Sequence, residues 1–558
     1  MKLFFKAVFL LLLTTNLQAQ EDLKDWYHKD PSSGVMGSSV DKTYSNLLKG
    51  MTSETVIVAI IDSGVDIEHE DLAGNIWVNL DEIPDNGIDD DKNGYIDDVN
   101  GWNFIGGPDG KNVGPDTYEV TRLYGKYKHK FENAKPELLN KKDKKKYEEF
   151  LVWKEEVEKQ RNSAESALEQ VSNIEATIKA ALDGLKNALA DKSLDFSLEN
   201  INSIESDDQL IAIAQKISGD FLPGSDITTL AGLRESIASE IDSDKKRQQD
   251  KLEYAYNPDF NPRKTIVKDN YRNSTEKYYG NNDVEGPDAL HGTHVAGIVG
   301  AVRNNDLGMN GVADNVLIMS VRTVPDGDER DKDVANAIRY AVDNGASIIN
   351  MSFGKGYSWT KDVVDDAVRY AEKHDVLLVH AAGNSAQNND ITGNFPNDKY
   401  RKPKGFWFWK KKKAKTWIEV GALSYNTGEQ SVAPFSNYGT NNVDIFAPGM
   451  KIYSTLPDDK YRYLQGTSMA APVVAGAAAV LRSYFPKLKA EQVKKILMKS
   501  TESLDFNVTQ PGSEDGADLV PFKSLSKSGG VLSLTKAVKM AKMTKGKKKI
   551  KTKKKGSA

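Results

Sequence analysis

The segment Thr55-Val-Ile-Val-Ala-Ile-Ile-Asp62 decides the fold class, because an almost uninterrupted apolar run ends on a carboxylate. A run of this kind, without alternation of polar and apolar residues, is typical of a parallel strand buried on both faces. Further apolar runs and intervening helical runs alternate along the chain, at 316–324, 332–344, 362–373, 417–423, 443–447 and 490–499. This alternation predicts an α/β fold with a mainly parallel sheet between two layers of helices. Asp62 would then lie at the carboxyl end of a strand, where open α/β sheets build their sites.

A second segment, Leu464-Gln-Gly-Thr-Ser-Met-Ala-Ala-Pro472, leads into a run rich in Ala, Val and Leu that ends near Tyr484. With Pro472 near its start, the run predicts a buried helix whose first turn carries Ser468. A helix N-terminus presents unpaired N–H groups and a positive dipole end, which stabilise a developing oxyanion. Ser468 is therefore a candidate nucleophile. The alternative is a small-residue helix that packs closely against its neighbours.

A serine nucleophile needs a base within hydrogen-bond reach and a third group that holds the base in one tautomer. The segment His291-Gly-Thr-His-Val-Ala-Gly297 offers two candidate bases, His291 and His294. Histidines at this spacing can also share a metal ion. A zinc site would require further His, Cys or acidic ligands, and the chain contains no Cys. Asp62 and Asp66 are rival candidates for the third group.

Three segments resemble, in their chain order, the catalytic motifs of the subtilisin-like serine peptidases, the subtilase family. They are Ile61-Asp-Ser-Gly-Val65, His291–Gly297 and Leu464–Pro472. The resemblance covers about residues 50–110 and 280–541. It implies a three-layer α/β sandwich and a catalytic triad of Asp62, His291 and Ser468. His294 would then be a packed or hydrogen-bonded helix residue, and Asp66 a turn or capping residue.

Two more segments take their meaning from this resemblance. The run 376–382 predicts another buried strand, and the Gly383-Asn384-Ser385 that follows resembles the subtilase loop whose Asn side chain donates to the oxyanion. An ordinary Gly-Asn turn is the alternative. The segment 348–354 resembles the strand and loop that bind the substrate backbone by strand addition, which implicates Ser352, Phe353 and Gly354. Phe353 stands where an aliphatic residue is expected, so the shape of the main side-chain pocket stays open.

An acidic loop between residues 85 and 98 has the spacing of a calcium-binding loop. Oxygen ligands recur at the positions used by an EF-hand, and the candidates are Asp89, Asp91, Asn93, the carbonyl of Tyr95, and Asp97. Asn100 replaces the last-position Glu, so Asp98 is the candidate substitute. Six acidic side chains in this loop repel one another unless a cation is bound. We therefore predict structural calcium and no organic cofactor; a solvated acidic loop is the alternative.

The N-terminus has the features of a secretory signal peptide over residues 1–19. Lys2 and Lys6 start the segment, and an apolar stretch from Ala7 to Leu13 follows. Ala19 offers a small residue for cleavage. No other stretch is long and apolar enough to span a bilayer. We expect an exported protein that is periplasmic, cell-surface or extracellular. A retained membrane anchor is the alternative.

The domain organisation predicted from the sequence has one large insertion. After a short extension at 20–50, the peptidase domain would comprise residues 51–116 and 281–541, with a helical insertion at 117–280 and a disordered Lys-rich tail at 542–558. Apolar residues recur at intervals of three and four from Leu168 to Leu189, which is typical of a long amphipathic helix. The insertion could be a substrate-gating lid, a partner-binding arm, an intramolecular inhibitor or a decoration that packs on itself.

Two basic segments bear on the partners of the chain. The tail holds nine lysines, and residues 406–415 combine aromatic residues with lysines, yet the whole 558-residue chain has a net charge of −5. An acidic body with local basic segments does not favour a nucleic-acid partner. We expect protein or peptide substrates. The resemblance to the subtilases implies an exported serine endopeptidase that forms an acyl-enzyme. The alternative function is a catalytically idle scaffold that binds a cell-surface partner.

Overall fold

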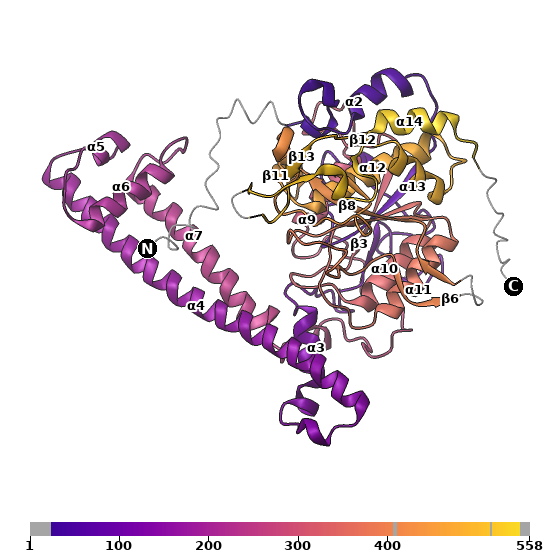
Figure 1. The fold of residues 1–558 in the computed structure, drawn as a ribbon, viewed down its shortest axis with the longest axis horizontal. Coiled ribbons are helices and arrows are strands. Elements are labelled where there is room, and N and C mark those ends of the chain that lie inside the picture. Colours follow the sequence, from indigo (N-terminus) through magenta and orange to yellow (C-terminus); the bar gives the residue numbers. More distant parts are fainter. Residues whose placement is uncertain (1–23, 405–409, 514–515, 547–558) are drawn as a thin grey trace. The chain divides into compact units, whose positions relative to one another are not determined.

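The computed structural model describes residues 24–404, 410–513 and 516–546, which belong to two compact units (Figure 1). One unit contains Val120–Phe260, and the other contains Leu23–Glu119 and Asn261–Ala558. The expected signal peptide, the aromatic residues 406–409 and most of the Lys-rich tail lie outside the described residues.

The larger unit is built on a nine-stranded sheet with the strand order β12-β15-β9-β8-β5-β4-β1-β3-β2. Its strands pair in parallel except for β12 with β15, which are antiparallel. The strands are β1 (Val56–Asp62), β2 (Gly101–Asn103), β3 (Val316–Arg322), β4 (Ile348–Met351), β5 (Leu377–Ala381), β8 (Trp417–Leu423), β9 (Ile445–Pro448), β12 (Glu502–Ser503) and β15 (Gly530–Val531). Because β1, β4 and β5 pair in parallel in the middle of the sheet, their carboxyl ends lie at one edge.

Helices cover both faces of this sheet. They are α8 (Pro262–Thr265), α9 (Leu290–Gly300), α10 (Asp331–Asp343), α11 (Lys361–Lys373), α12 (Thr467–Tyr484), α13 (Ala490–Lys499) and α14 (Leu534–Met543), with α2 (Val40–Thr43) near the N-terminus. The strand β1 explains the layers, because its side chains alternate between two cores. Val58 and Ile60 pack with α9 and α12, whereas Ala59 and Ile61 pack with α10 and α11. The predicted α/β class with a mainly parallel sheet is thus confirmed.

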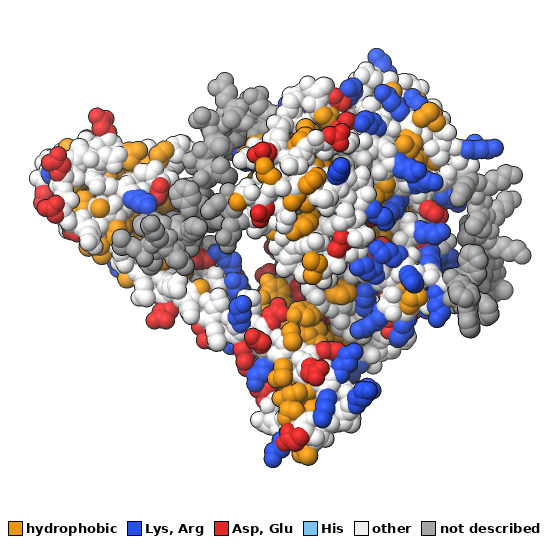
Figure 2. Space-filling model, viewed as in Figure 1, with side chains coloured by type: hydrophobic (Ala, Val, Ile, Leu, Met, Phe, Trp, Pro, Cys, Tyr) orange, Lys and Arg blue, Asp and Glu red, His pale blue; other side chains and the backbone are white. Residues whose placement is uncertain are grey.

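Three small antiparallel pairs complete this unit. They are β6 (Lys399–Lys404) with β7 (Lys411–Lys413), β10 (Ile452–Leu456) with β11 (Lys460–Leu464), and β13 (Asn507–Thr509) with β14 (Leu519–Pro521). Lys and Arg side chains gather on the face that carries β6 and α11 (Figure 2). Several are paired with α11 carboxylates, as in Lys402 with Asp362 at 2.5 Å and Lys404 with Asp366 at 2.7 Å.

The segment before β1 is packed into the core of the larger unit. Trp26 and Tyr27 are fully buried, and the indole N–H of Trp26 donates to the Lys451 carbonyl at 3.0 Å. The hydroxyls of Thr43 and Thr535 lie 2.8 Å apart, so α2 and α14 are joined by a buried hydrogen bond. Removing this segment would expose apolar surface that now contributes to folding.

The smaller unit is helical and has its own apolar core. It contains α3 (Glu119–Phe131, from its second residue), α4 (Lys141–Asp191), α5 (Leu198–Asn202), α6 (Gln209–Phe221) and α7 (Leu230–Asp250). The 51 residues of α4 form a rod of roughly 75 Å. Leu182, Leu185 and Leu189 of α4 pack with Ile211 of α6 and Leu233 of α7. The C-terminal part of the apolar stripe predicted in the insertion, from Ile178 to Leu189, is therefore covered within the unit itself.

None of the described helices has the length and the apolar composition needed to cross a membrane.

Candidate active site

The carboxyl end of β1 and the first turn of α9 bring Asp62 and His291 together. Nδ1 of His291 lies 2.6 Å from Oδ1 of Asp62, and Asp62 is 1% exposed. Burial lowers the pKa of His291, but the charge of Asp62 and the hydrogen bond to it act the other way, so this pKa is raised overall. With Nδ1–H donated to the carboxylate, Nε2 is the ring nitrogen left to accept a proton.

Two glycines allow this close approach of α9 to the end of β1. A Cβ on Gly292 would lie 1.9 Å from the carbonyl oxygen of Gly64, so no larger residue fits directly after His291. Gly64 itself has a φ of 131°, a conformation that L side chains rarely adopt. The glycines that flank Asp62 and His291 in sequence are thus part of the geometry that joins the two side chains.

Ser468 is the second residue of α12, as the sequence predicted for the first turn of this helix. Its hydroxyl donates to the carbonyl of Ser352 at 2.9 Å, and the hydroxyl of Ser352 donates to the carbonyl of Ser468 at 2.8 Å. The end of β4 and the start of α12 are therefore held side by side.

Asn384 is oriented by the residue that precedes Ser468. Its Oδ1 accepts hydrogen bonds from the backbone N–H and from the hydroxyl of Thr467, both at 2.8 Å. Because the oxygen of the side-chain amide is engaged in this way, its NH₂ group is available for another acceptor.

The NH₂ group of Asn384 faces a small space that Gly466 leaves open. A Cβ on Gly466 would stand 3.3 Å from Nδ2 of Asn384, 3.5 Å from the backbone nitrogen of Ser468 and 3.7 Å from Cβ of Ser468. Gly466 has a φ of 151°, which also favours glycine. The open space is therefore bordered by two N–H donors and by the candidate nucleophile, which is the arrangement that an oxyanion requires.

A pocket of about 330 Å³ adjoins this space. It is lined by Val324, Gly327, Asp328, Glu329, Phe353, Gly354, Ala381, Gly383, Asn384, Thr467 and Ser468. The ionisable side chains among these residues are the carboxyls of Asp328 and Glu329. Burial raises the pKa of Glu329 to about 8, although the charge of Lys355 opposes this shift. The pocket thus has an acidic wall and, in Phe353, an apolar one.

His294 and Asp66 take structural positions in the fold. Nε2 of His294 lies 3.0 Å and 3.1 Å from the carbonyls of Arg462 and Ile452, and burial lowers the pKa of the ring to about 3. The carboxylate of Asp66 accepts from the backbone N–H groups of Glu68 and Asp458. Both side chains are committed to neighbouring backbone groups, away from the Asp62–His291 pair.

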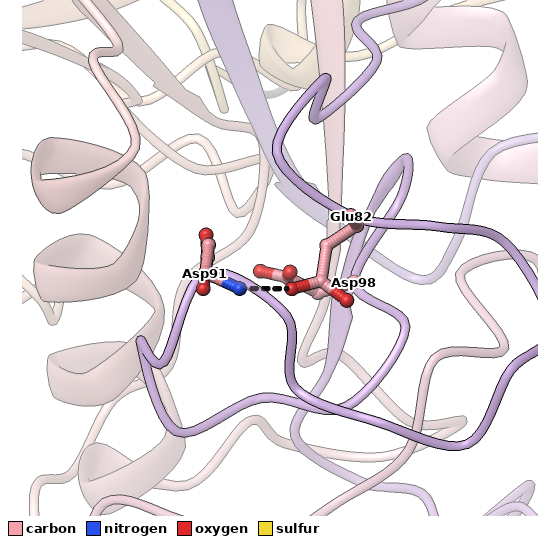
Figure 3. A group of neighbouring side chains, drawn as sticks. All are labelled: Glu82, Asp91 and Asp98. Carbon is pink, nitrogen blue, oxygen red and sulfur yellow. Dashed lines mark hydrogen bonds between the residues drawn. The ribbon is translucent and has the colours of Figure 1, made fainter.

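The acidic loop brings two of its predicted ligands together with a residue that the sequence analysis missed. Ligand oxygens of Glu82, Asp91 and Asp98 lie within 4.8 Å of one another (Figure 3). Asp98 is fully buried and Glu82 is 6% exposed, and burial raises the pKa of Asp98 to about 6. Within the described residues, Oε2 of Glu82 is buried without a hydrogen-bond partner. Three carboxylates with one unsatisfied buried oxygen fit a hard cation such as calcium.

The other predicted ligands shape this loop. Asp89 accepts from the backbone N–H groups of Asn93 and Gly94, and Asp97 accepts from those of Asn86 and Gly87. The amide of Asn93 donates to both Asp91 and Asp98 at 2.9–3.0 Å. The ring of Tyr95 packs against Trp102, Phe104 and Tyr340. Asp89 and Asp97 therefore hold the loop closed, while Asp91 and Asp98 face Glu82.

Other site residues were also invisible to sequence reasoning. Thr467 precedes Ser468 in the sequence without a role of its own being predicted. In the structure its hydroxyl orients Asn384. Glu82 lies outside the repeating spacing of the acidic loop, and its proximity to Asp91 depends on a turn. A single carboxylate before an acidic run was the only available signal.

Comparison with known proteins shows the family of the chain. The profile of the Subtilase family matches residues 53–518. Over 194 residues the chain is 41% identical to the thermophilic serine proteinase of Bacillus sp. (strain AK1), a match that covers 35% of this chain but only 42% of that protein. Over 218 residues it is 37% identical to subtilisin DY of Bacillus licheniformis, covering 38% of this chain and 71% of the relative.

A solved structure described as a protease of Pseudoalteromonas arctica PAMC 21717 matches with 27% identity and a TM-score of 0.37, covering 47% of this chain and 78% of the other. The profile match extends over most of the chain and includes Asp62, His291, Asn384 and Ser468. The chain therefore belongs to the subtilase family of serine-type endopeptidases.

Proposed function

We propose that this chain is an exported serine endopeptidase that uses Asp62, His291 and Ser468 as its triad and Asn384 as an oxyanion donor. The observation that carries the proposal is the open space beside Gly466. Two N–H donors and the carbon of the candidate nucleophile border that space, and the hydrogen-bonded Asp62–His291 pair comes from neighbouring elements.

The proposed reaction begins with proton transfer from Oγ of Ser468 to Nε2 of His291. The oxygen attacks the scissile carbonyl carbon, and the resulting oxyanion enters the space faced by Asn384 and the N–H of Ser468. His291 then gives the proton to the leaving amine, which breaks the C–N bond and leaves an acyl-enzyme. Water, deprotonated by His291, releases the acid and restores Ser468. Asp62 stays ionised and stabilises the imidazolium throughout.

Substrate binding would use the segment Ser352, Phe353 and Gly354, which follows β4. Phe353 is 9% exposed and Gly354 is exposed, and both line the pocket beside Ser468. An extended peptide that pairs with this segment would place one of its side chains in the pocket. Gly354 also allows the side chain of Asn394 to approach, because a Cβ at this position would lie 2.5 Å from Oδ1 of Asn394.

Calcium would act as a structural cofactor at Glu82, Asp91 and Asp98. A bound cation would neutralise three clustered carboxylates and satisfy the buried Oε2 of Glu82. The loop is joined to the sheet by Tyr340 of α10, whose hydroxyl donates to Asp98 at 2.6 Å. We propose that the metal stabilises this part of the peptidase unit and takes no part in the chemistry.

Export would follow from the apolar N-terminal segment of the sequence. One of the relatives is a cell wall-associated protease of Bacillus subtilis (strain 168), which is 32% identical over 239 residues and matched over 24% of its length.

The decisive test labels the purified full chain with a fluorophosphonate probe, which reacts with an activated serine hydroxyl. We expect labelling of the parent chain, no labelling of Ser468→Ala, and casein hydrolysis by the parent alone. Reaction of Ser468→Ala at the rate of the parent would contradict the assigned nucleophile. A folded parent that neither reacts with the probe nor cleaves casein would favour the alternative of an idle scaffold.

A further inference from the structure

We propose that Asn437, assisted by Asn389 and Asn394, is a positioning residue that sets the oxyanion donor Asn384; this inference rests on the proposed peptidase function. The three side chains come from loops that follow β5 and β8. They converge on the peptide between Ala382 and Gly383, directly before Asn384, so we call them the asparagine clamp.

The three clamp side chains share one acceptor, a backbone carbonyl oxygen, and Asn394 also donates to the carbonyl of Ala381 at 3.1 Å. The shared carbonyl oxygen, that of Ala382, accepts hydrogen bonds from Nδ2 of Asn389 at 2.9 Å, of Asn394 at 3.0 Å and of Asn437 at 3.0 Å. The strand β5 ends at Ala381, so this carbonyl lies just beyond the strand. Three side-chain donors on one backbone oxygen fix its direction far more tightly than a single ladder bond would.

The direction of this carbonyl determines where the next N–H points, because a peptide unit is planar. The N–H of Gly383 points to the hydroxyl of Thr467, with a nitrogen–oxygen distance of 3.1 Å. The same hydroxyl donates to Oδ1 of Asn384 at 2.8 Å. A continuous path of hydrogen bonds therefore runs from the clamp, through one peptide unit and Thr467, to the side chain of Asn384.

Asn437 also holds the loop on the far side of Asn384. Its Oδ1 accepts from the backbone N–H groups of Ser385 at 3.0 Å and Gln387 at 2.9 Å. Its own backbone N–H donates to the carbonyl of Gly383 at 2.9 Å. These partners fix the orientation of the amide, because the oxygen faces donors and the nitrogen faces acceptors.

The burial of Asn437 makes this arrangement stiff. The residue is 5% exposed and Asn389 is 7% exposed, and their side chains are joined by a hydrogen bond of 3.0 Å. A buried amide that loses its partners incurs the full desolvation penalty, so the clamp has few alternative conformations. Asn437 is not among the residues that line the substrate pocket. Its influence on the reaction would therefore be indirect, through the loop of Gly383 and Asn384 that it holds.

The test is a double-mutant cycle between Asn437 and Asn384, measured with a peptide ester and with a peptide amide. Asn437→Ala should lower kcat by about 10- to 100-fold with little change in KM, because a misplaced donor weakens transition-state binding. In the Asn384→Ala background, the same substitution should lower kcat less than about threefold, since the donor it positions is already absent.

A matched control is Asn336→Ala. This asparagine of α10 is 2% exposed and donates to Glu276 and Tyr279, so its loss also disturbs a buried amide network in the same unit. Its loss should lower the melting temperature without changing kcat. If Asn336→Ala and Asn437→Ala lower kcat equally, the effect of Asn437 is general destabilisation and the proposal is wrong.

The remaining outcomes are also decisive. Equal losses from Asn437→Ala in the parent and in the Asn384→Ala background would overturn the clamp. If Asn437→Ala fails to fold, Asn389→Ala removes one donor from the Ala382 carbonyl, and the same cycle with Asn384→Ala applies to it. An inactive parent, with no difference between it and Ser468→Ala, would contradict the proposed function instead.

Discussion

Ser352 and Ser468 exchange two hydrogen bonds, each hydroxyl donating to the backbone carbonyl of the other residue. A hydroxyl has one proton to donate, so Oγ of Ser468 must leave the Ser352 carbonyl before it can donate to His291. In the proposed reaction, a rotation about the Cα–Cβ bond of Ser468 would release Oγ from the Ser352 carbonyl. The second bond keeps the start of α12 against β4 meanwhile, so the nucleophile moves without its helix.

The pH dependence of the reaction should report the Asp62–His291 pair. Catalysis needs neutral His291, and its pKa is raised by Asp62, so activity falls as the pH decreases through this raised value. Asp62→Asn removes the charge and replaces one carboxylate oxygen by an NH₂ donor, which favours the wrong tautomer of His291. We expect kcat/KM to fall by roughly 10⁴ and the residual acid limb to move to lower pH.

The contribution of the Asp62–His291 pair to the free energy of unfolding has a pH dependence opposite to that of activity. Because the folded pKa of His291 is raised, the stabilisation is complete below the unfolded value of about 6.5 and is lost as the pH rises through the folded value. Thermal melting of the parent and Asp62→Asn between pH 5 and pH 8 (roughly the range over which histidine titrates) measures this difference. In the activity measurement, an acid limb of the kcat/KM profile that does not move in Asp62→Asn would contradict the assignment of His291 and Asp62.

Removal of calcium should destabilise the parent chain. A ligand that binds only the folded state at about 100 times its Kd adds about 2.7 kcal/mol, so a chelator should lower the melting temperature by several degrees. The double variant Glu82→Gln with Asp91→Asn should melt at the same temperature with and without chelator.

Asp81→Asn is the control for this experiment. Asp81 is exposed and lies beside Glu82 in the chain, outside the cluster of Glu82, Asp91 and Asp98. This variant should keep the sensitivity of the parent to chelator. An unchanged melting curve of the parent in excess chelator would speak against the metal site.

The acidic wall of the pocket should make the enzyme discriminate between charged substrates. Asp328 and Glu329 line the pocket together with Ser468, but the raised pKa of Glu329, about 8, leaves that carboxyl largely protonated near neutral pH. The charge of Asp328 should therefore attract a cationic substrate side chain and repel an anionic one. We expect Asp328→Asn to reduce the ratio of kcat/KM for a lysine peptide to that for its glutamate analogue by about three- to tenfold. A ratio that stays constant, measured at several salt concentrations, would mean that these carboxylates do not face the substrate.

The helical unit should be dispensable for the chemistry of small substrates. Its apolar core is formed by residues of the unit itself. An ion pair of 2.5 Å between Glu175 and Lys245 joins α4 to α7. Replacing 176–244 by a short Gly/Ser turn should therefore leave the sheet unit folded and hydrolysis of a peptide ester unchanged. The rate on folded proteins should change, because the unit is inserted between the strand of Asp62 and the helix of His291.

The variant Arg234→Ala is the control for this truncation. It removes only the exposed ion pair with Asp183 and should leave both rates as in the parent. Equal changes for ester and protein in the truncated chain would mean that the unit has no part in substrate choice. Loss of soluble protein would mean that it belongs to the fold of the peptidase.

The local signals in the sequence were sufficient for the main elements. The apolar run before Asp62 predicted β1, and the proline and small residues after Ser468 predicted the first turn of α12, because strand and helix patterns are set by neighbouring residues. The acidic loop was less transparent: its spacing predicted Asp89, Asp91, Asn93, Tyr95 and Asp97 as ligands, with Asp98 as a substitute, and only Asp91 and Asp98 lie in the carboxylate cluster with Glu82. The long helix of the insertion was equally visible from its apolar intervals.

Tertiary structure alone decided which groups meet. Glu82 joins Asp91 and Asp98 through a turn, and Thr467 meets Asn384 across a gap of 83 residues. The clamp of Asn389, Asn394 and Asn437 has no motif at all, because an asparagine in a loop carries no periodicity and its partners are backbone atoms. The sequence by itself predicted the main elements and the residues that we propose supply the chemistry. The packing of the sheet edge against α9 and α12 decided their distances, since long-range contacts depend on how buried surfaces fit together.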